Sequence, residues 1–252
     1  MKTKSEIVRD WLPRYTGRPL EGFGKYILLS NFGQYIERFG VEILGRDKPM
    51  ASATAGGITI LNFGMGSAMA ATVMDLLSAI EPKAVLLLGK CGGLKTAKIG
   101  DFLLPTAAIR GEGTSNDYMP PEIPALPSFR LQKAVSTAIV RHGLDYWTGT
   151  VYTTNRRVWE HDEAFKSYLQ TIRASGIDME TATIFIVGFV NRIPKGALLL
   201  VSDSPMTPEG VKTSRSDEDV NARFVETHLA VGIDALIELR DSGDSVVHLR
   251  YE

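Results

Sequence analysis

The sequence predicts an α/β fold in which helices cover both faces of a central, mostly parallel sheet. Short apolar runs of strand length alternate along the chain with longer stretches of helical pattern. Two of the runs, 84–89 (AVLLLG) and 197–201 (ALLLV), lack polar side chains, as expected of strands buried on both faces. This alternation is typical of a three-layer α/β/α architecture. No linker divides the chain, so we expect residues 1–252 to form a single domain.

In the first part of the chain, strands and helices can be placed from residue type and from turn-forming and helix-capping residues. The strands are expected at 25–30, 58–63, 84–89 and 102–109. Gly56-Gly57 lies between two strand-like stretches and predicts a hairpin turn. At least one helical turn is expected over 34–39, and a longer helix over 68–80 with Ser67 as its N-cap.

The second part continues the alternation after a long surface loop at 111–128, which is rich in Gly, Pro, Ser and Asn. Strands are expected at 148–153 and 197–201. The helices are expected at 129–142, 159–173, 180–192 and 217–240, with Pro194 following the third. Residues 241–252 are expected to form a tail, extended over 245–250.

Ligands of such folds bind at the carboxyl ends of the parallel strands, so the segments leaving those strands are the candidates for a site. These segments are 30–34, 63–67, 89–93, 153–159 and 202–205.

Composition argues against several classes of partner and compartment. With 28 Lys+Arg against 29 Asp+Glu, the net charge of −1 lacks the basic excess that a nucleic-acid binder needs. No apolar run approaches the ~18 residues of a membrane span, and residues 1–6 lead into no signal-peptide core. A single Cys suits a reducing compartment. We therefore expect a cytoplasmic protein with no nucleic-acid and no membrane partner.

The motifs predict neither a cofactor nor a metal. A dinucleotide fingerprint would need a small residue where Met69 stands, and a phosphate-binding P-loop would need Gly at Ala84 and Ser or Thr at Cys91. The four histidines show no metal-ligand spacing; they are His142, His161, His228 and His248.

Two glycine-rich segments are candidates for backbone that approaches a small ligand closely. Residues 64–67 (GMGS) lie between a predicted strand and helix, where helix amides would face an anion; the alternative is a tight turn that needs glycine. Residues 89–93 (GKCGG) are expected to form a turn after the most apolar strand. Cys91 fits a buried spectator better than a nucleophile.

Two acidic segments are candidates for chemistry on a sugar or a base. Asp178-Met179-Glu180 opens a helical stretch, where acids are favoured for structural reasons alone. The functional alternative is a carboxylate that accepts hydrogen bonds from two vicinal hydroxyls. Asp203 follows the buried strand 197–201, a good position for acid chemistry, although Ser-Asp-Ser-Pro also suits a turn.

Taken together, these motifs resemble the nucleoside phosphorylase/nucleosidase family. The matching set is Leu61–Ser67, GKCGGL (89–94), DMETAT (178–183) and VSDSP (201–205), in the family's order, within a resemblance that covers about residues 25–240. The pieces LNFGMGSAMAATVMDLL, LLGKCGGLKTAKIGD, GTVYTTNRRVWE and DMETATIFIVGF are most similar to the catalytic domain of the branch that hydrolyses AMP. The long bacterial form of that branch has an extra amino-terminal domain, which we do not expect in this chain.

The resemblance implies a nucleoside phosphorylase-like fold, a role for each site residue and no cofactor. Asp203 would protonate the leaving purine at N7, and Glu180 would hold the ribose hydroxyls, with Met179 and Met65 against the sugar. The aromatic wall over the purine would be Trp159, with Tyr118 and Phe185 as alternatives. The further residues expected to line the site are Gly66, Lys90, Cys91, Gly92, Asn155 and Asp178.

Departures from the family pattern bear on the nucleophile. Phosphorylases of this family hold phosphate with an Arg in the first loop and another before the GxCG segment. Here the first loop is SNFGQ (30–34) and the second position is Leu87. The resemblance therefore implies water as the nucleophile. The Glu that often places this water is also missing, and Asn31 or Gln34 could replace it.

Basic residues on the ligand-edge segments are expected to hold the substrate's 5′-phosphate, because a dianion needs fixed cations. They are Lys90, Arg156, Arg157, Lys212 and Arg215. The family's subunits form dimers that share residues across the interface, often stacked into hexamers. A dimer-based homo-oligomer, up to a hexamer, is thus expected, with Arg46 as the candidate cation contributed to a neighbouring subunit.

Three functions follow from this pattern, and the third belongs to a different class from the other two. The first is hydrolysis of AMP to adenine and ribose 5-phosphate. The second is a phosphorylase or nucleosidase acting on unphosphorylated nucleosides, which the basic residues disfavour. The third is a non-catalytic nucleotide-binding protein, which the presence of both Asp203 and Glu180 disfavours.

Overall fold

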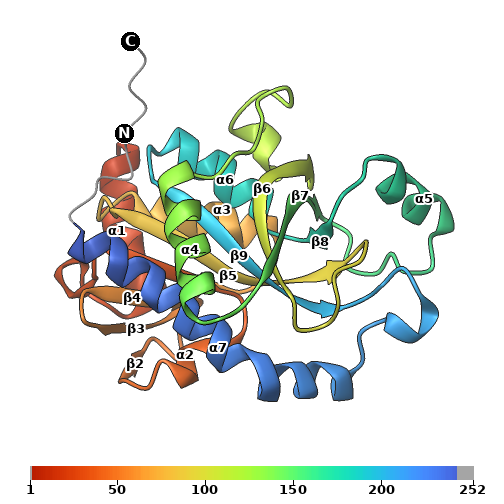
Figure 1. The fold of residues 1–252 in the computed structure, drawn as a ribbon. Coiled ribbons are helices and arrows are strands. Elements are labelled where there is room, and N and C mark those ends of the chain that lie inside the picture. The colour runs from red at the N-terminus through yellow and green to blue at the C-terminus, as the bar shows by residue number, and fades with distance from the viewer. Residues whose placement is uncertain (1, 243–252) are drawn as a thin grey trace, which may run out of the picture.

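The computed structural model describes residues 2–242, and all its strands join one mixed sheet between two layers of helices (Figure 1). The strand order is β2-β3-β4-β1-β5-β8-β7-β6-β9, and β5 pairs with β9 as well. The second pairing closes β5, β8, β7, β6 and β9 into a ring. Their bounds and those of the other strands are β1 Tyr26–Ser30, β2 Ile43–Leu44, β3 Ala51–Ala55, β4 Ile58–Asn62, β5 Ala84–Gly93, β6 Phe102–Gly111, β7 Tyr146–Thr154, β8 Gly176–Asp178 and β9 Lys195–Asp203.

Six of the helices form two layers, each packed on its own apolar core, whereas α5 packs in a smaller separate cluster with Trp159. On one face α1, α3 and α6 contribute side chains such as Leu12, Met74 and Phe185 to the first core. On the other face α2, α4 and α7 contribute Tyr35, Leu131 and Leu236 to the second. The bounds of the helices are α1 Lys4–Thr16, α2 Gly33–Arg38, α3 Ser67–Leu77, α4 Phe129–Arg141, α5 Glu163–Thr171, α6 Thr181–Val190 and α7 Ser214–Asp241, with short 3₁₀ turns at η1 Leu20–Gly22, η2 Thr114–Asp117 and η3 Pro208–Gly210.

The predicted α/β class is confirmed, with parallel and antiparallel pairs in one sheet. Parallel pairs join β1 to β4 and β5, β5 to β9, and β7 to β6 and β8, whereas β5–β8 and β6–β9 are antiparallel. The hairpin at Gly56-Gly57 is confirmed, since β3 and β4 pair antiparallel around it. Neither α1 nor β8 was predicted from the sequence. Of the predicted tail at 241–252, Asp241 belongs to α7, and residues 243–252 lie outside the described residues.

Three local predictions differ from the structure. Gly66, at φ 90°, occupies the N-cap position of α3, and Ser67 instead donates its hydroxyl to the Met179 carbonyl at 2.8 Å. Residues 89–93 are not a turn but the last part of β5, paired with both β8 and β9. The glycines serve close packing: a Cβ on Gly92 would lie 2.8 Å from Pro205 Cγ. The helix expected over 159–173 is also shorter, because α5 begins only at Glu163.

A buried polar pair fixes α7 against α2 and β9. His228 Nε2 lies 3.0 Å from the Leu198 carbonyl, which can only accept, so this nitrogen carries the proton. Its Nδ1 then accepts from the Tyr35 hydroxyl at 2.7 Å. Burial lowers the pKa of His228 to about 3, which keeps the imidazole neutral and in this tautomer. The middle of α7 is thereby held against α2 and β9.

Within residues 2–242, no helix has both the length and the apolar composition needed to span a bilayer.

Candidate active site

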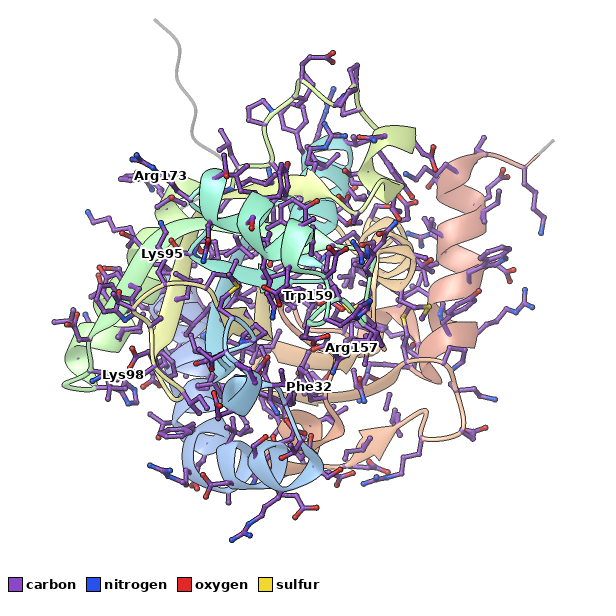
Figure 2. The ribbon with its side chains drawn as sticks, turned by 90° about the vertical axis from the view of Figure 1, so that its right-hand side faces the viewer. Phe32, Lys95, Lys98, Arg157, Trp159 and Arg173 are labelled. Atoms are coloured by element: carbon purple, nitrogen blue, oxygen red, sulfur yellow. The ribbon has the colours of Figure 1, made fainter. Side chains whose placement is uncertain are left out.

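A cavity of about 300 Å³ lies where the predicted segments meet, beyond the ends of β1, β5, β8 and β9. Three of its lining residues are labelled in Figure 2, namely Phe32, Arg157 and Trp159. The cavity gathers most of the predicted site residues, namely Met65, Lys90, Cys91, Gly92, Arg156, Arg157, Trp159, Asp178, Met179, Glu180, Asp203 and Lys212. It also brings in residues that the sequence analysis had not assigned to the site, including Phe32, Glu160 and Asp217. The topology rule for α/β sheets therefore located the cavity correctly.

Asp178 anchors the floor of this cavity. Its carboxylate accepts hydrogen bonds from the Thr153 hydroxyl on β7 at 2.7 Å and from the Thr181 amide at 2.8 Å, as well as from the Glu180 amide at 3.3 Å. Burial raises the pKa of Asp178, and these donors oppose the rise. The carboxylate thus ties β7 to the first turn of α6 and fixes the backbone of Glu180.

Glu180 is buried and faces the cavity. Its carboxylate accepts from the Gly66 amide at 2.7 Å and the Met179 amide at 3.3 Å. Burial, reinforced by the charge of Asp178, raises the pKa of Glu180 to about 8. Hydrogen bonds from the Gly66 and Met179 amides and from the Asn31 side chain oppose this rise. Asn31 Oδ1 is buried without a hydrogen-bond partner. Glu180 is thus a carboxyl group with a raised pKa that is held between fixed donors.

Asp203 ends β9 on the opposite side of the cavity. Burial raises its pKa, while the Ser202 hydroxyl, which donates to Oδ1 at 2.6 Å, and the charges of Lys212 and Arg157 oppose the rise. A carboxyl group with a raised pKa that also lines a cavity suits proton donation to a bound molecule.

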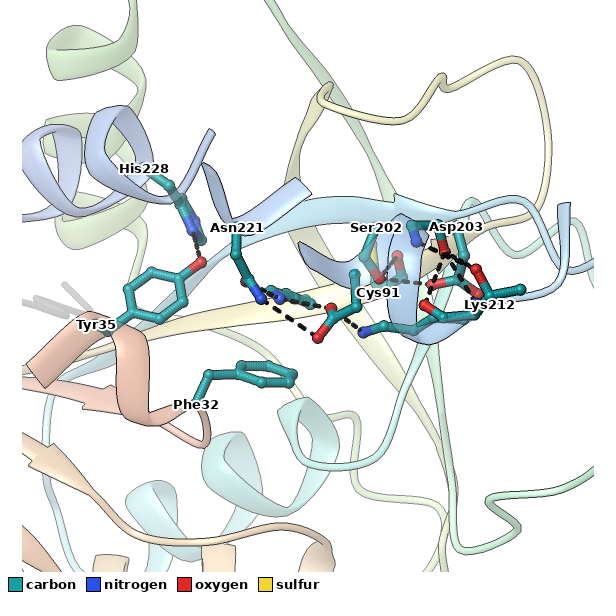
Figure 3. A network of polar contacts seen from close by, with 12 residues as sticks. Phe32, Tyr35, Cys91, Ser202, Asp203, Lys212, Asn221 and His228 are labelled. Carbon is teal, nitrogen blue, oxygen red and sulfur yellow. Dashed lines mark hydrogen bonds and ion pairs between the residues drawn. The ribbon is translucent and has the colours of Figure 1, made fainter. Parts of the chain in front are cut away.

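A second cluster joins β5, the start of α7 and the loop before α7 (Figure 3). Lys90 Nζ lies 2.9 Å from Asp217 Oδ1 and donates to Asn221 Oδ1 at 2.5 Å. Lys212 Nζ lies 2.7 Å from the same Asp217 oxygen. Phe32 presents its ring to both ammonium groups, 4.3 Å from Lys90 Nζ and 5.4 Å from Lys212 Nζ. Burial alone would raise the pKa of Asp217, but the two lysines outweigh it and lower that pKa.

The rim of the cavity is formed by residues after β7. Trp159 is buried and packs edge-on against Phe165. Arg156 is paired with Asp162 at 2.8 Å and Arg157 with Glu160 at 3.4 Å, and both side chains are about half exposed. Met65 is 55% exposed on the other side. The cavity therefore has an aromatic wall, and its outer charges already have partners.

Several candidates lie away from the cavity lining. Gly66 contributes its amide to Glu180 but does not line the cavity, and Asn155 and Arg215 are exposed. Arg46 pairs with Glu37 on the surface at 2.6 Å. Of the alternative aromatic residues, Phe185 is fully buried in the first core and Tyr118 donates to Asp75 at 2.8 Å. Gln34, unlike Asn31, is not among the lining residues.

Cys91 is buried beneath the cavity floor, and burial raises its thiol pKa well above the usual value. The thiol is therefore unsuited to act as a nucleophile. Within residues 2–242, no group of three or more His, Cys, Asp or Glu side chains could hold a metal ion.

Comparison with known proteins shows the family of this chain. The phosphorylase superfamily profile matches residues 37–238. AMP nucleosidase of Escherichia coli K12 is 31% identical over 92% of this chain, and the chain spans 58% of the length of that relative. Uridine phosphorylase of Treponema pallidum is 28% identical over 71% of this chain and 72% of its own length.

Solved structures extend the comparison. The crystal structure of AMP nucleosidase from Bacteroides thetaiotaomicron VPI-5482 is 60% identical, with a TM-score of 0.86 over 96% of this chain and 100% of that one. Uridine phosphorylase from Vibrio fischeri ES114 shares the fold at 20% identity, with a TM-score of 0.76 over 87% and 93% of the two chains. The chain belongs to the phosphorylase superfamily.

The raised pKa of Glu180 predicts a specific dependence of stability on pH. Its folded-state pKa of about 8 exceeds the ordinary value of 4.5, so the unfolded chain loses this proton first as pH rises. Glu180 should therefore lower the free energy of unfolding by up to ~1.4 kcal/mol per pH unit between those values. Urea unfolding should be measured at pH 5 and pH 8. Between these pH values the free energy of unfolding should fall less in Glu180→Gln than in wild type. The exposed Glu163→Gln should behave as wild type, and equal losses in all three proteins would contradict the assignment.

Proposed function

We propose that this member of the phosphorylase superfamily hydrolyses the N-glycosidic bond of AMP to adenine and ribose 5-phosphate. The observation that carries the proposal is that one cavity combines a carboxyl group suited to donate a proton, Asp203, with a second carboxyl group, Glu180, and a lysine pair, Lys90 and Lys212. Two relatives that carry the name AMP nucleosidase, at 31% and 60% identity, support it.

Asp203 acts as the general acid in this proposal. Breaking the bond between C1′ and N9 leaves electron density on the purine, and a proton delivered to N7 stabilises that charge. Burial raises the pKa of Asp203 above its ordinary value, which favours the protonated form that a general acid needs, and the Ser202 hydroxyl fixes the orientation of the carboxyl group. Positioned proton transfer of this kind contributes roughly 10²–10⁴ in rate.

Glu180 holds the ribose. Its two oxygens already accept from the Gly66 and Met179 amides, which fixes the carboxyl group toward the cavity. Hydroxyl donors from a sugar would favour its anionic form and lower its pKa. An anion beside the sugar stabilises the positive charge that develops on an oxocarbenium-like transition state. Met65 and Met179 supply the apolar contacts to the sugar.

Water is the proposed nucleophile. Its oxygen adds to C1′ as the bond to N9 breaks, and the purine keeps the proton from Asp203. One water proton passes to solvent, from which Asp203 is reprotonated. Asn31 lines the cavity beside Glu180, and its unpartnered Oδ1 is an acceptor that can orient this water.

The proposal extends to the 5′-phosphate and to assembly. The outer arginines Arg156 and Arg157 and the inner lysines Lys90 and Lys212 are the cations available at the cavity. A cytoplasmic homo-oligomer built from dimers, up to a hexamer, is part of the proposal, with Arg46 reaching a neighbour's site once released from Glu37.

Product analysis tests the proposal directly. Incubation with AMP should release adenine at the same rate with and without inorganic phosphate, and phosphorus NMR should show ribose 5-phosphate. Adenosine should be cleaved at least about a hundredfold less efficiently, because it lacks charge-assisted bonds worth roughly 1.5–3 kcal/mol each. Formation of ribose 1,5-bisphosphate, or equal cleavage of adenosine, would overturn the proposal.

Substitution of the acid gives a second test. Asp203→Asn keeps the shape but has no transferable proton, so kcat for AMP should fall by about two orders of magnitude or more, with little change in AMP affinity. Asp219→Asn, on the exposed surface of α7 and paired with Arg223, is the control and should keep full activity. Wild-type kcat in Asp203→Asn would remove this residue from the mechanism.

A further inference from the structure

Two lysines at the cavity share one carboxylate oxygen. Lys90 Nζ and Lys212 Nζ lie 2.9 and 2.7 Å from Asp217 Oδ1. The side chain of Lys90 is only 2% exposed and that of Lys212 is 18% exposed. Lys90, Lys212 and Asp217 carry a net charge of +1 among themselves, and burial lowers the pKa of Lys90. Asp203 is a further carboxyl group of the cavity whose charge acts on both lysines. The cluster therefore has an excess of positive charge that a bound anion would balance.

Unused donors remain on both ammonium groups. Each ammonium carries three N–H donors. Lys90 directs two of them to Asp217 and Asn221. Within residues 2–242, the ammonium group of Lys212 has one polar partner, Asp217. A phosphate group offers several acceptor oxygens that match such a cluster.

Phe32 holds the two cations at one place. Its ring lies 4.3 and 5.4 Å from the two Nζ atoms, and the attraction of a cation to the ring face favours the charged forms. The outer arginines are less suited to bind an anion inside the cavity, because Arg156 and Arg157 are about half exposed and already paired with Asp162 and Glu160.

The two lysines differ in how firmly they are held. Lys90 lies on β5 and keeps Asn221 as a second partner. Lys212 lies in the connection between β9 and α7, and Asp217 in the first turn of α7 is its partner. Loss of the Lys212–Asp217 contact would leave Lys90 in place and free Lys212 to follow an incoming anion.

We propose that Lys90 and Lys212 form the binding site for the substrate's phosphate group, and that Asp217 is an internal counter-anion that gives up Lys212 to that phosphate. This inference rests on the proposed function for the identity of the substrate. It adds a residue, Asp217, whose negative charge opposes binding and thereby sets the affinity for phosphorylated over unphosphorylated ligands.

Calorimetric binding of ribose 5-phosphate at pH 7 tests the proposal, with ribose as the uncharged comparison. Asp217→Asn removes the competing charge, so it should bind ribose 5-phosphate about tenfold more tightly than wild type, as expected for one unit charge a few ångströms away. Lys212→Met should bind it at least about tenfold more weakly. Ribose binding should be the same in all variants.

The matched control is Asp219→Asn, two residues further along α7, which removes an equal charge from the exposed pair with Arg223 and should bind like wild type. Unchanged or weaker binding by Asp217→Asn would overturn the proposal, as would unchanged binding by a folded Lys212→Met. These outcomes are independent of catalysis. If AMP is not hydrolysed but Asp217→Asn tightens binding, the proposed function fails and the phosphate site stands; if AMP is hydrolysed without that tightening, only the phosphate site fails.

Discussion

The site depends on the buried carboxylate of Asp178 and on the donors that compensate its burial. A charge removed from water is costly unless fixed donors surround it. Thr153 on β7 and the amides that open α6 supply them, so β7, β8 and α6 are held in one arrangement. This arrangement orients Glu180, and the proximity of the two carboxyl groups helps to raise the pKa of Glu180. Asp178, whose own role is structural, thus determines the orientation of Glu180 and contributes to its raised pKa.

The alternation of side chains along β5 divides the cavity into two electrostatic halves. Cys91 faces the core beneath α3 and α6, on the side of Asp178 and Glu180. Lys90, one residue earlier, points to the opposite face and meets Asp217 and Asn221 of α7. Asp178 and Glu180 therefore lie on one side, and the two lysines with Asp217 lie on the other. A nucleotide, with hydroxyls at one end of its sugar and a phosphate at the other, matches this polarity.

The sequence located the cavity because apolar strands and the polar segments that follow them are local patterns. Asp203 and Glu180 were found in this way, and the resemblance to the family gave them roles. The turn predicted at 89–93 was wrong, because glycines that permit close packing between strands form the same sequence pattern as a glycine-rich turn. Phe32 and Asp217 were missed because their importance comes from contacts with Lys90 and Lys212, which lie far away along the chain. The ring that β5, β8, β7, β6 and β9 form also depends on long-range pairing.

The most direct test of this account is a crystal structure of the Asp203→Asn variant with AMP bound. The account predicts the purine N7 within hydrogen-bond distance of the substituted side chain at position 203, the ribose hydroxyls on Glu180, and the phosphate on Lys90 and Lys212, with Asp217 displaced from Lys212. A phosphate bound instead by Arg156 and Arg157, with the Asp217 pair intact, would contradict the division of the site. A sugar turned away from Glu180 would contradict the proposed chemistry as well.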